Sequence, residues 1–153
     1  MRVLRDRTEF GYILAIILGA VLILGGCATP KYSYDPRADF SSLKSYTWAS
    51  APVAASQDPL IEKNVRYYAE QSLKNKGFAP TPDNPDFVTS MSYETDYDSP
   101  YKLNRLYLYV YRGKDLIWQG WAKGGIRTDA ASPELGEAVR KILTNFPPKP
   151  PKR

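Results

Sequence analysis

Histidine is absent from this sequence, and cysteine occurs only once, at position 27. Without imidazole the chain cannot build a serine–histidine–aspartate triad or a Cys/His metal site, and a single thiol cannot close an intramolecular disulfide. Any catalysis by this chain alone would have to use carboxylates, lysine, tyrosine or serine. We therefore expect neither a metal site nor a cofactor.

A concentrated basic surface is also lacking, although the formal net charge is +5 and the pI is about 9.2. Three basic residues lie before position 26, and Lys149, Lys152 and Arg153 lie in the proline-rich C-terminal stretch. The part between is close to neutral, so we expect no nucleic-acid partner. A chain of 153 residues is long enough for one domain.

The amino terminus has the layout of a bacterial export signal. Arg2, Arg5 and Arg7 form a basic start, and an apolar run follows over residues 10–26. The end of this run resembles the lipobox of bacterial lipoproteins, in which an aliphatic and two small residues precede the modified cysteine: Leu24, Gly25, Gly26 and Cys27. We predict that residues 1–26 are removed and that the thiol of Cys27 takes a diacylglycerol, with acyl chains such as palmitate.

The alternative is an uncleaved signal anchor, since an apolar run of this length is at the lower limit for crossing a bilayer. Both interpretations tether the domain to a membrane. In many Gram-negative bacteria an Asp after the modified cysteine retains lipoproteins in the inner membrane, and here the residue is Ala28. By that resemblance we expect the periplasmic face of the outer membrane, or the extracytoplasmic face of the cell membrane if only one membrane exists.

Periodicity predicts the order β-α-β-β-β-α. The strands are expected at residues 43–48, 87–97, 103–112 and 116–123, with apolar and polar side chains alternating. The first helix is expected to begin at Asp58 and Pro59 and to end at Gly77, and the second to begin at Ser132 and end before Pro147.

These elements predict an α+β two-layer sandwich, in which two helices cover one face of an antiparallel four-stranded sheet. The expected organisation has a signal peptide over residues 1–26 and a lipidated N-terminus with spacer over residues 27–35. The α+β domain follows over residues 36–146. A disordered Pro/Lys-rich tail is expected over residues 147–153, as a solubilising segment or a polyproline ligand.

Aromatic side chains alternate with the apolar core residues in the strand at 103–112. Tyr107, Tyr109 and Tyr111 would share one face, with Trp121 and Ile117 on the neighbouring strand. Such a face could bind a glycan, a lipid or a partner protein, because aromatic rings give contact area at low entropic cost. The alternative is that residues 49–57, or the segment carrying Tyr32 and Tyr34, cover this face.

Three acidic residues recur at every second position: Glu94, Asp96 and Asp98. On a strand they would share one face, about 6.5–7 Å apart, which is wide for one cation, and no calcium-type loop surrounds them. We expect a solvated face paired with Arg105 or Lys102. They are also the only candidates for a carboxylate-dependent hydrolase of envelope glycan or lipid.

Several short motifs together resemble the bacterial lipoproteins classified as domain of unknown function 4136. The resemblance covers residues 34–147 and rests on these segments: residues 34–36, 39–40, 46–48, 73–78, 117–122, 138–143 and 146–147. It implies a small α+β module facing the periplasm, and it supplies no catalytic residues.

The sequence thus predicts a non-catalytic envelope lipoprotein that has a binding or structural role. The partner would be an envelope protein, glycan or lipid. An auxiliary subunit of a lipid or solute export complex is the alternative.

Overall fold

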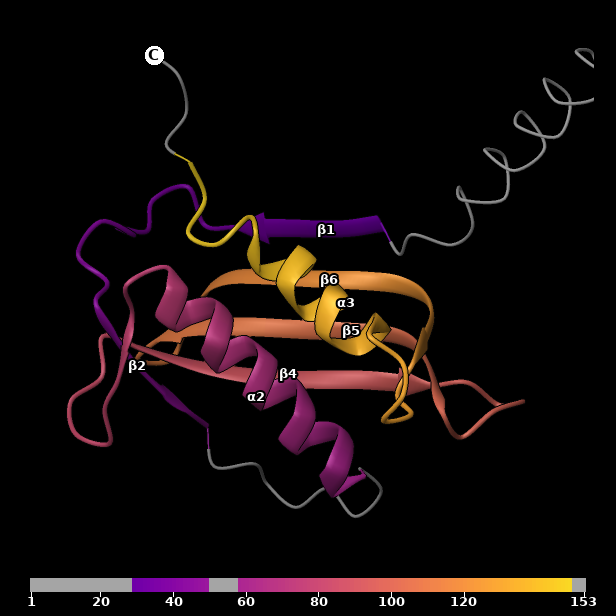
Figure 1. Ribbon diagram of the computed structural model, residues 1–153. Helices are drawn as coiled ribbons and strands as arrows, with labels where there is room; N and C mark the ends of the chain where they lie inside the picture. The colour runs from indigo at the N-terminus through magenta and orange to yellow at the C-terminus, as the bar shows by residue number, and fades with distance from the viewer. Residues whose placement is uncertain (1–28, 50–57, 150–153) are drawn as a thin grey trace, which may run out of the picture.

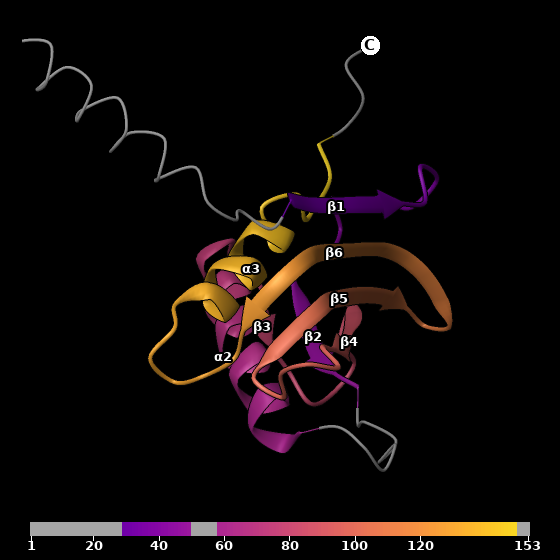
Figure 2. The ribbon, with the colours of Figure 1, turned by 90° about the vertical axis from the view of Figure 1, so that its right-hand side faces the viewer.

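The computed structural model describes residues 29–49 and 58–149, which form a six-stranded sheet with two helices packed on one face (Figure 1). The strand order is β1-β6-β5-β4-β2-β3. The two helices lie together on one side of a sheet that bends strongly along β5 and β6 (Figure 2). In chain order the elements are β1 (Thr29–Tyr34), β2 (Ser45–Trp48), α2 (Pro59–Asn75), β3 (Ala79–Pro80), β4 (Phe87–Thr95), β5 (Lys102–Arg112), β6 (Asp115–Arg127) and α3 (Glu134–Leu143).

The α+β class is confirmed, but the expected antiparallel four-stranded sheet is wrong. Strands β4, β5 and β6 pair antiparallel, whereas β2 pairs parallel to both β3 and β4. The parallel pairing follows from the connection, because β2 reaches β4 through the helix α2, which returns the chain to the starting end of the sheet. The sheet is therefore mixed.

Strand β1 lies in the segment that was expected to be a spacer. It pairs antiparallel with β6 from Thr29 opposite Lys123 to Tyr34 opposite Trp118. Its composition does not signal a strand, because it contains Pro30. Proline is tolerated here because β1 is an edge strand, which pairs with one neighbour only. The ordered domain consequently includes residues that the sequence assigned to the linker.

The first helix has the ends that the sequence predicts. The Asp58 carboxylate accepts the Leu60 N–H at 2.8 Å, and Pro59 occupies the first helical position. At the other end Gly77 adopts φ +88°, so that its N–H reaches Lys74 O at 2.9 Å and the Phe78 N–H reaches Leu73 O at 3.1 Å. These local signals fix both the length of α2 and the direction in which the chain leaves it.

The second helix begins slightly later than expected, at Glu134 instead of Ser132. The Ser132 hydroxyl still accepts the Glu134 N–H at 3.3 Å. Its apolar side packs on β6, where Gly120 leaves room for the approach, since a Cβ at Gly120 would lie 2.7 Å from Ile142 Cγ2. The absence of a side chain at this position therefore lets α3 lie directly on the sheet.

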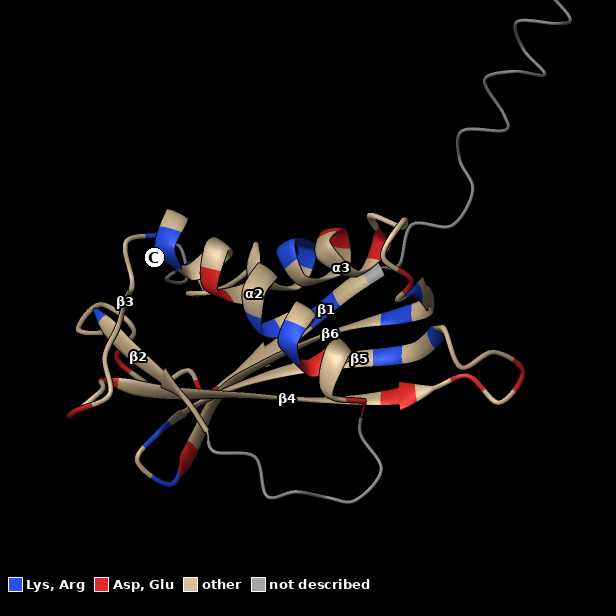
Figure 3. Cartoon of the chain, turned by 60° about the horizontal axis from the view of Figure 1, so that its bottom comes forward, with Lys and Arg blue, Asp and Glu red and all other residues tan. Residues whose placement is uncertain are grey.

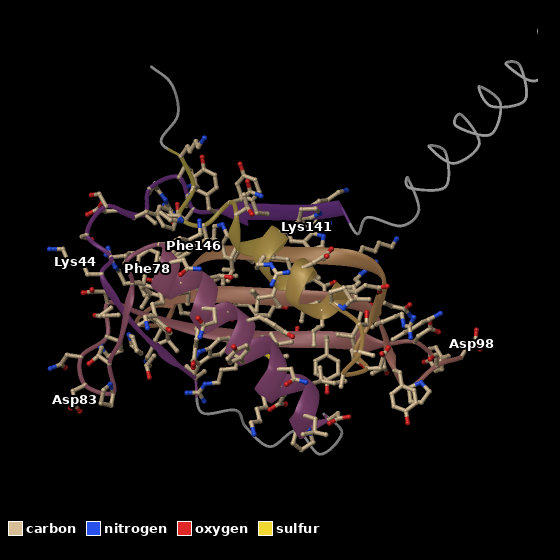
Figure 4. All side chains as sticks on the ribbon, viewed as in Figure 1. Lys44, Phe78, Asp83, Asp98, Lys141 and Phe146 are labelled. Carbon is tan, nitrogen blue, oxygen red and sulfur yellow. The ribbon has the colours of Figure 1, made fainter. Side chains whose placement is uncertain are left out.

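An aromatic cluster joins the end of α3 to the sheet. The Phe146 side chain is fully buried, and its ring lies 5.2–6.3 Å from the rings of Trp118, Phe78, Phe87 and Phe40. Phe78 and Phe146 lie close together although they come from distant parts of the chain (Figure 4). This cluster closes the layer between helices and sheet at one end.

The C-terminal stretch is not wholly a free tail. Pro148 is buried, whereas Pro147 and Lys149 are exposed. The start of the expected tail therefore packs on the domain, and residues 150–153 lie outside the described residues. The strand expected over residues 87–97 is shorter than predicted, because β4 ends at Thr95 and Tyr97 beyond it is fully exposed.

Asp86 holds the start of β2 to the start of β4. Its carboxylate accepts the Lys44 N–H at 2.9 Å, the Ser45 N–H at 2.8 Å and the Ser45 hydroxyl at 3.0 Å. The backbone bonds from Lys44 and Ser45, followed by the Ser45 hydroxyl, hold the pKa of Asp86 below its usual value near 3.8. The folded protein thus favours the charged carboxylate.

We expect Asp86→Asn to lower the melting temperature at pH 7. A depressed pKa stabilises the fold above the pKa of the unfolded chain, and this stabilisation disappears as the pH falls through the lower folded pKa. The difference from the wild type should therefore shrink at about pH 3 and below. Thermal unfolding monitored by circular dichroism at both pH values tests this. Asp83→Asn in the same connection is the control, and an equal loss at both positions would contradict the assignment.

Candidate functional site: the tyrosine face

The side of the sheet opposite the helices carries the aromatic side chains that the sequence singled out. In β5 the residues Leu106, Leu108 and Val110 are buried toward the helices, and the residues between them point to the other side. Both helices lie on the core side of the sheet (Figure 3). We call Tyr107, Tyr109, Tyr111 and Trp121 the tyrosine face, and all four side chains are partly exposed.

The rings of this face touch one another in a continuous row. Tyr107 and Tyr109 have nearly parallel rings 6.0 Å apart, and Tyr109 lies 6.4 Å from Tyr111. Trp121 lies opposite Tyr107 in the pairing of β5 with β6, with the ring centroids 6.5 Å apart. Trp121 thus lies on the side of the tyrosines, whereas Trp118 lies opposite the buried Val110 and is itself buried.

Polar groups flank the rings on both neighbouring strands. On β4 the Ser92 hydroxyl lies 3.0 Å from the Tyr109 hydroxyl. Gln119 lies opposite Tyr109 on β6, and Ser90 lies opposite Tyr109 on β4. Aromatic rings bordered by hydroxyl and amide groups can bind a ligand that has both apolar and hydrogen-bonding surfaces.

An ion pair borders the same side at one end of the row. Arg105 Nη1 donates to the Tyr107 hydroxyl at 3.1 Å and lies 3.5 Å from Glu94 Oε1. The Tyr107 hydroxyl in turn donates to Glu94 Oε1 at 3.4 Å. The hydrogen bond that Arg105 donates to Tyr107 and the charge of Glu94 raise the pKa of Arg105. The guanidinium and the carboxylate therefore orient Tyr107 within the face.

One of the two expected covers is excluded. Tyr34 lies opposite Trp118 and Tyr32 opposite Gly120, so both tyrosines belong to the helix side of the sheet. The other expected cover, residues 49–57, is described only at Ala49. Within the described residues, neither helix packs on the tyrosine face.

Ile117 does not join this face as expected. The pairing of β5 and β6 shifts here, since Val110 lies opposite Trp118 while Tyr111 lies opposite Leu116. Ile117 is the extra residue of this bulge and is buried, at 5 % exposure, whereas Leu116 is 42 % exposed. Leu116 therefore takes the position beside Tyr111.

The three acidic residues are not brought together. Glu94 pairs with Arg105, as expected for a solvated strand face. Asp96 and Asp98 lie beyond the end of β4, where the Asp96 carboxylate accepts the Asp98 N–H at 3.0 Å. Their placement on one strand face is therefore wrong, because the strand ends at an irregularity between Glu94 and Thr95. Within residues 29–49 and 58–149, no three metal-ligating side chains form a cluster.

The predicted lipidation and cleavage residues, Leu24, Gly25, Gly26 and Cys27, lie outside the described residues. Within the described part of the chain, no helix is both long and apolar enough to cross a bilayer.

The sequence did not indicate a groove of about 440 Å³ at the far end of β1. Tyr34, Phe40 and Pro148 contribute apolar surface to it, and Asp39 and Lys149 contribute charge. It forms where the connection between β1 and β2 meets the C-terminal stretch. No sequence signal could have predicted this meeting, because the two segments are more than 100 positions apart.

The sequence matches the model of the family described as domain of unknown function, DUF4136, over residues 30–148. No curated protein matches it. Among solved structures, the chain is similar to a PelC dodecamer from Paraburkholderia phytofirmans, with 16% identity, a TM-score of 0.55, and coverage of 77% of this chain and 95% of that chain.

A PDZ domain protein from Parabacteroides distasonis is also similar, with 15% identity, a TM-score of 0.52 and coverage of 80% of this chain. The match covers 36% of that protein, so this chain spans about a third of its length. Identities this low show a common fold only. The family match, in contrast, extends over the described domain and well over half of the sequence, and the chain therefore belongs to the DUF4136 family.

Proposed function

We propose that this chain is a membrane-anchored envelope lipoprotein whose domain binds a partner through the tyrosine face without catalysing a reaction. The observation that carries the binding role is the continuous aromatic row on the side of the sheet opposite the helices. Aromatic rings of this kind dominate binding energy in many interfaces. The partner would be an envelope protein, glycan or lipid.

The anchoring part of the proposal rests on the sequence, in which Gly25 and Gly26 directly precede the single cysteine. A lipid on Cys27 would hold the domain at the periplasmic face of the outer membrane. The domain would then meet its partners at the membrane surface instead of by diffusion through the periplasm.

A role as an auxiliary subunit of an export complex is the second candidate. The similar PelC structure is a dodecamer, and assembly into a larger complex would bury the same kind of exposed aromatic surface. The two candidates differ in the identity of the partner and share the surface that binds it.

The experiment is crosslinking in native membranes with the full-length protein, followed by affinity purification and quantitative mass spectrometry. The test variant is Tyr107→Ala/Tyr109→Ala. Loss of two central aromatic side chains should reduce the recovery of specific partners by about tenfold or more, the change expected when an interface loses about 1.4 kcal/mol. Copies of this chain crosslinked to one another count as a partner.

Matched controls remove equally large tyrosines from other exposed sites. Tyr67 on α2 is 57 % exposed and Tyr97 is fully exposed, and neither belongs to the tyrosine face. The variant Tyr67→Ala/Tyr97→Ala should leave the partner recovery unchanged. A Tyr107→Phe/Tyr109→Phe variant keeps the rings and removes the hydroxyl bonds to Glu94 and Ser92. Identical partner lists for the wild type and Tyr107→Ala/Tyr109→Ala would contradict a binding role of the tyrosine face.

A further inference from the structure

The place where the chain enters the domain is one corner of the sheet. β1 begins at Thr29, which lies opposite Lys123 on β6. Cys27 is two residues earlier, and two extended residues span at most about 7 Å. If Cys27 carries the lipid, as the proposed function states, this corner must lie against the membrane surface.

Two lysines and a tryptophan share this corner. Lys31 lies opposite Trp121 in the pairing of β1 with β6, and Lys123 lies two residues further along β6, so all three point to the side of the tyrosine face. Lys31 and Lys123 are exposed, and Trp121 is partly exposed. We call Lys31, Trp121 and Lys123 the basic corner.

The neighbouring charges at this end of the sheet are largely paired. Arg105 lies opposite Lys123 and pairs with Glu94, and Arg127 pairs with Asp129 at 3.0 Å. Lys102 adds a further exposed cation on β5. The basic residues at this end of the sheet lie on β1, β6 and β5, away from the acidic tip of the β4–β5 hairpin (Figure 3).

The hairpin tip has the opposite charge. It carries Asp96 and Asp98 on either side of the fully exposed Tyr97. Asp98 lies at the outermost point of this end (Figure 4). A surface of anionic lipids would repel this tip and attract the basic corner, so that the two halves of this end differ in their affinity for the membrane.

We propose that the basic corner rests on the phospholipid headgroups of the membrane that holds Cys27. The ammonium groups of Lys31 and Lys123 would bind lipid phosphates, and the Trp121 ring would lie at the level of the headgroups, where tryptophan is enriched in membrane proteins. The inference rests on the proposed lipid anchor. It adds a second, electrostatic contact that fixes how the domain is oriented.

In this orientation the row of rings in the tyrosine face extends away from the membrane plane. β5 runs away from the corner, since Arg105 lies opposite Lys123 and Tyr111 lies near the β5–β6 turn at the other end. Tyr107, Tyr109 and Tyr111 would then stand at increasing distance from the lipid. The tyrosine face would then point parallel to the membrane plane, so that a partner at the membrane surface could reach it.

The test measures the quenching of tryptophan fluorescence by phospholipids with brominated chains. Full-length acylated protein is reconstituted into vesicles of phosphatidylcholine, with or without phosphatidylglycerol. The chain has two other tryptophans, the buried Trp118 and the partly buried Trp48. Both are present in the wild type and in Trp121→Phe, so the difference between these two proteins reports on Trp121. We expect stronger quenching in the wild type than in Trp121→Phe. This difference should be larger in the vesicles that contain phosphatidylglycerol.

The Lys31→Gln/Lys123→Gln variant should reduce that quenching by about twofold or more in the anionic vesicles, because lysines close to the surface supply the attraction. The control variant is Lys44→Gln/Lys114→Gln, which removes two exposed lysines at the opposite end of the sheet. It should leave the quenching unchanged. High salt should weaken only the additional quenching that phosphatidylglycerol causes.

Two failures remain distinguishable. Acylated protein that floats with the vesicles but shows no quenching of Trp121, or quenching that is indifferent to Lys31→Gln/Lys123→Gln, would overturn the headgroup contact and leave the anchor intact. Protein isolated from membranes without acyl chains would overturn the anchor and this inference with it.

Discussion

Phe146→Ala should lower the free energy of unfolding by about 3–5 kcal/mol, the range for removing a fully buried phenylalanine. The Phe146 side chain has no exposure to solvent. Its ring contacts Phe78 after α2, Phe87 at the start of β4 and Trp118 on β6. A cavity at this point would remove the ring contacts that join the end of α3 to β4, β6 and the segment after α2.

Urea unfolding of the purified full-length protein in detergent, followed by tryptophan fluorescence, measures this change. Phe146→Leu is the matched control, since it keeps an apolar side chain of similar volume and should cost less than about 1.5 kcal/mol. A loss below about 1 kcal/mol for Phe146→Ala would show that the cluster does not connect the two layers as described.

Cys27→Ser should abolish acylation completely. The serine hydroxyl is not the thiol that takes the diacylglycerol, so the signal segment should remain attached and an unprocessed precursor should accumulate. Metabolic labelling with palmitate and the mobility of the band in gel electrophoresis register both effects. Ala28→Ser, one position further, should keep both labelling and processing.

The same substitution separates the two interpretations of the amino terminus. An uncleaved signal anchor would show no acyl labelling in the wild type, and its mobility would not respond to Cys27→Ser. Equal behaviour of the wild type and the variant would therefore favour the anchor. It would also remove the geometric argument that brings Lys31 and Lys123 to the membrane, because that argument needs the lipid two residues before Thr29.

The features that the sequence predicted well are those encoded by a few adjacent residues. The capping carboxylate of Asp58 and the positive φ of Gly77 define α2 without help from the rest of the fold. The alternation along β5 likewise places Tyr107 and Tyr109 opposite the core, because a strand has a side-chain period of two. The alternation within β5 is therefore enough to predict the candidate binding face without knowledge of the neighbouring strands.

The errors concern pairing between distant segments. β1 becomes a strand because β6 offers it an edge, and nothing in the residues from Thr29 to Tyr34 reveals that partner. Ile117 leaves the tyrosine face because of one extra residue at the bulge opposite Val110 and Tyr111. Such a shift reverses the side on which a residue lies, and its position depends on both strands.

Mass spectrometry of the mature N-terminal peptide, taken from protein purified out of native membranes, tests the central claim most directly. We expect a peptide that begins at Cys27 and carries a diacylglyceryl group and further acyl mass. A peptide that begins at or near Met1, with an unmodified thiol at Cys27, would contradict it.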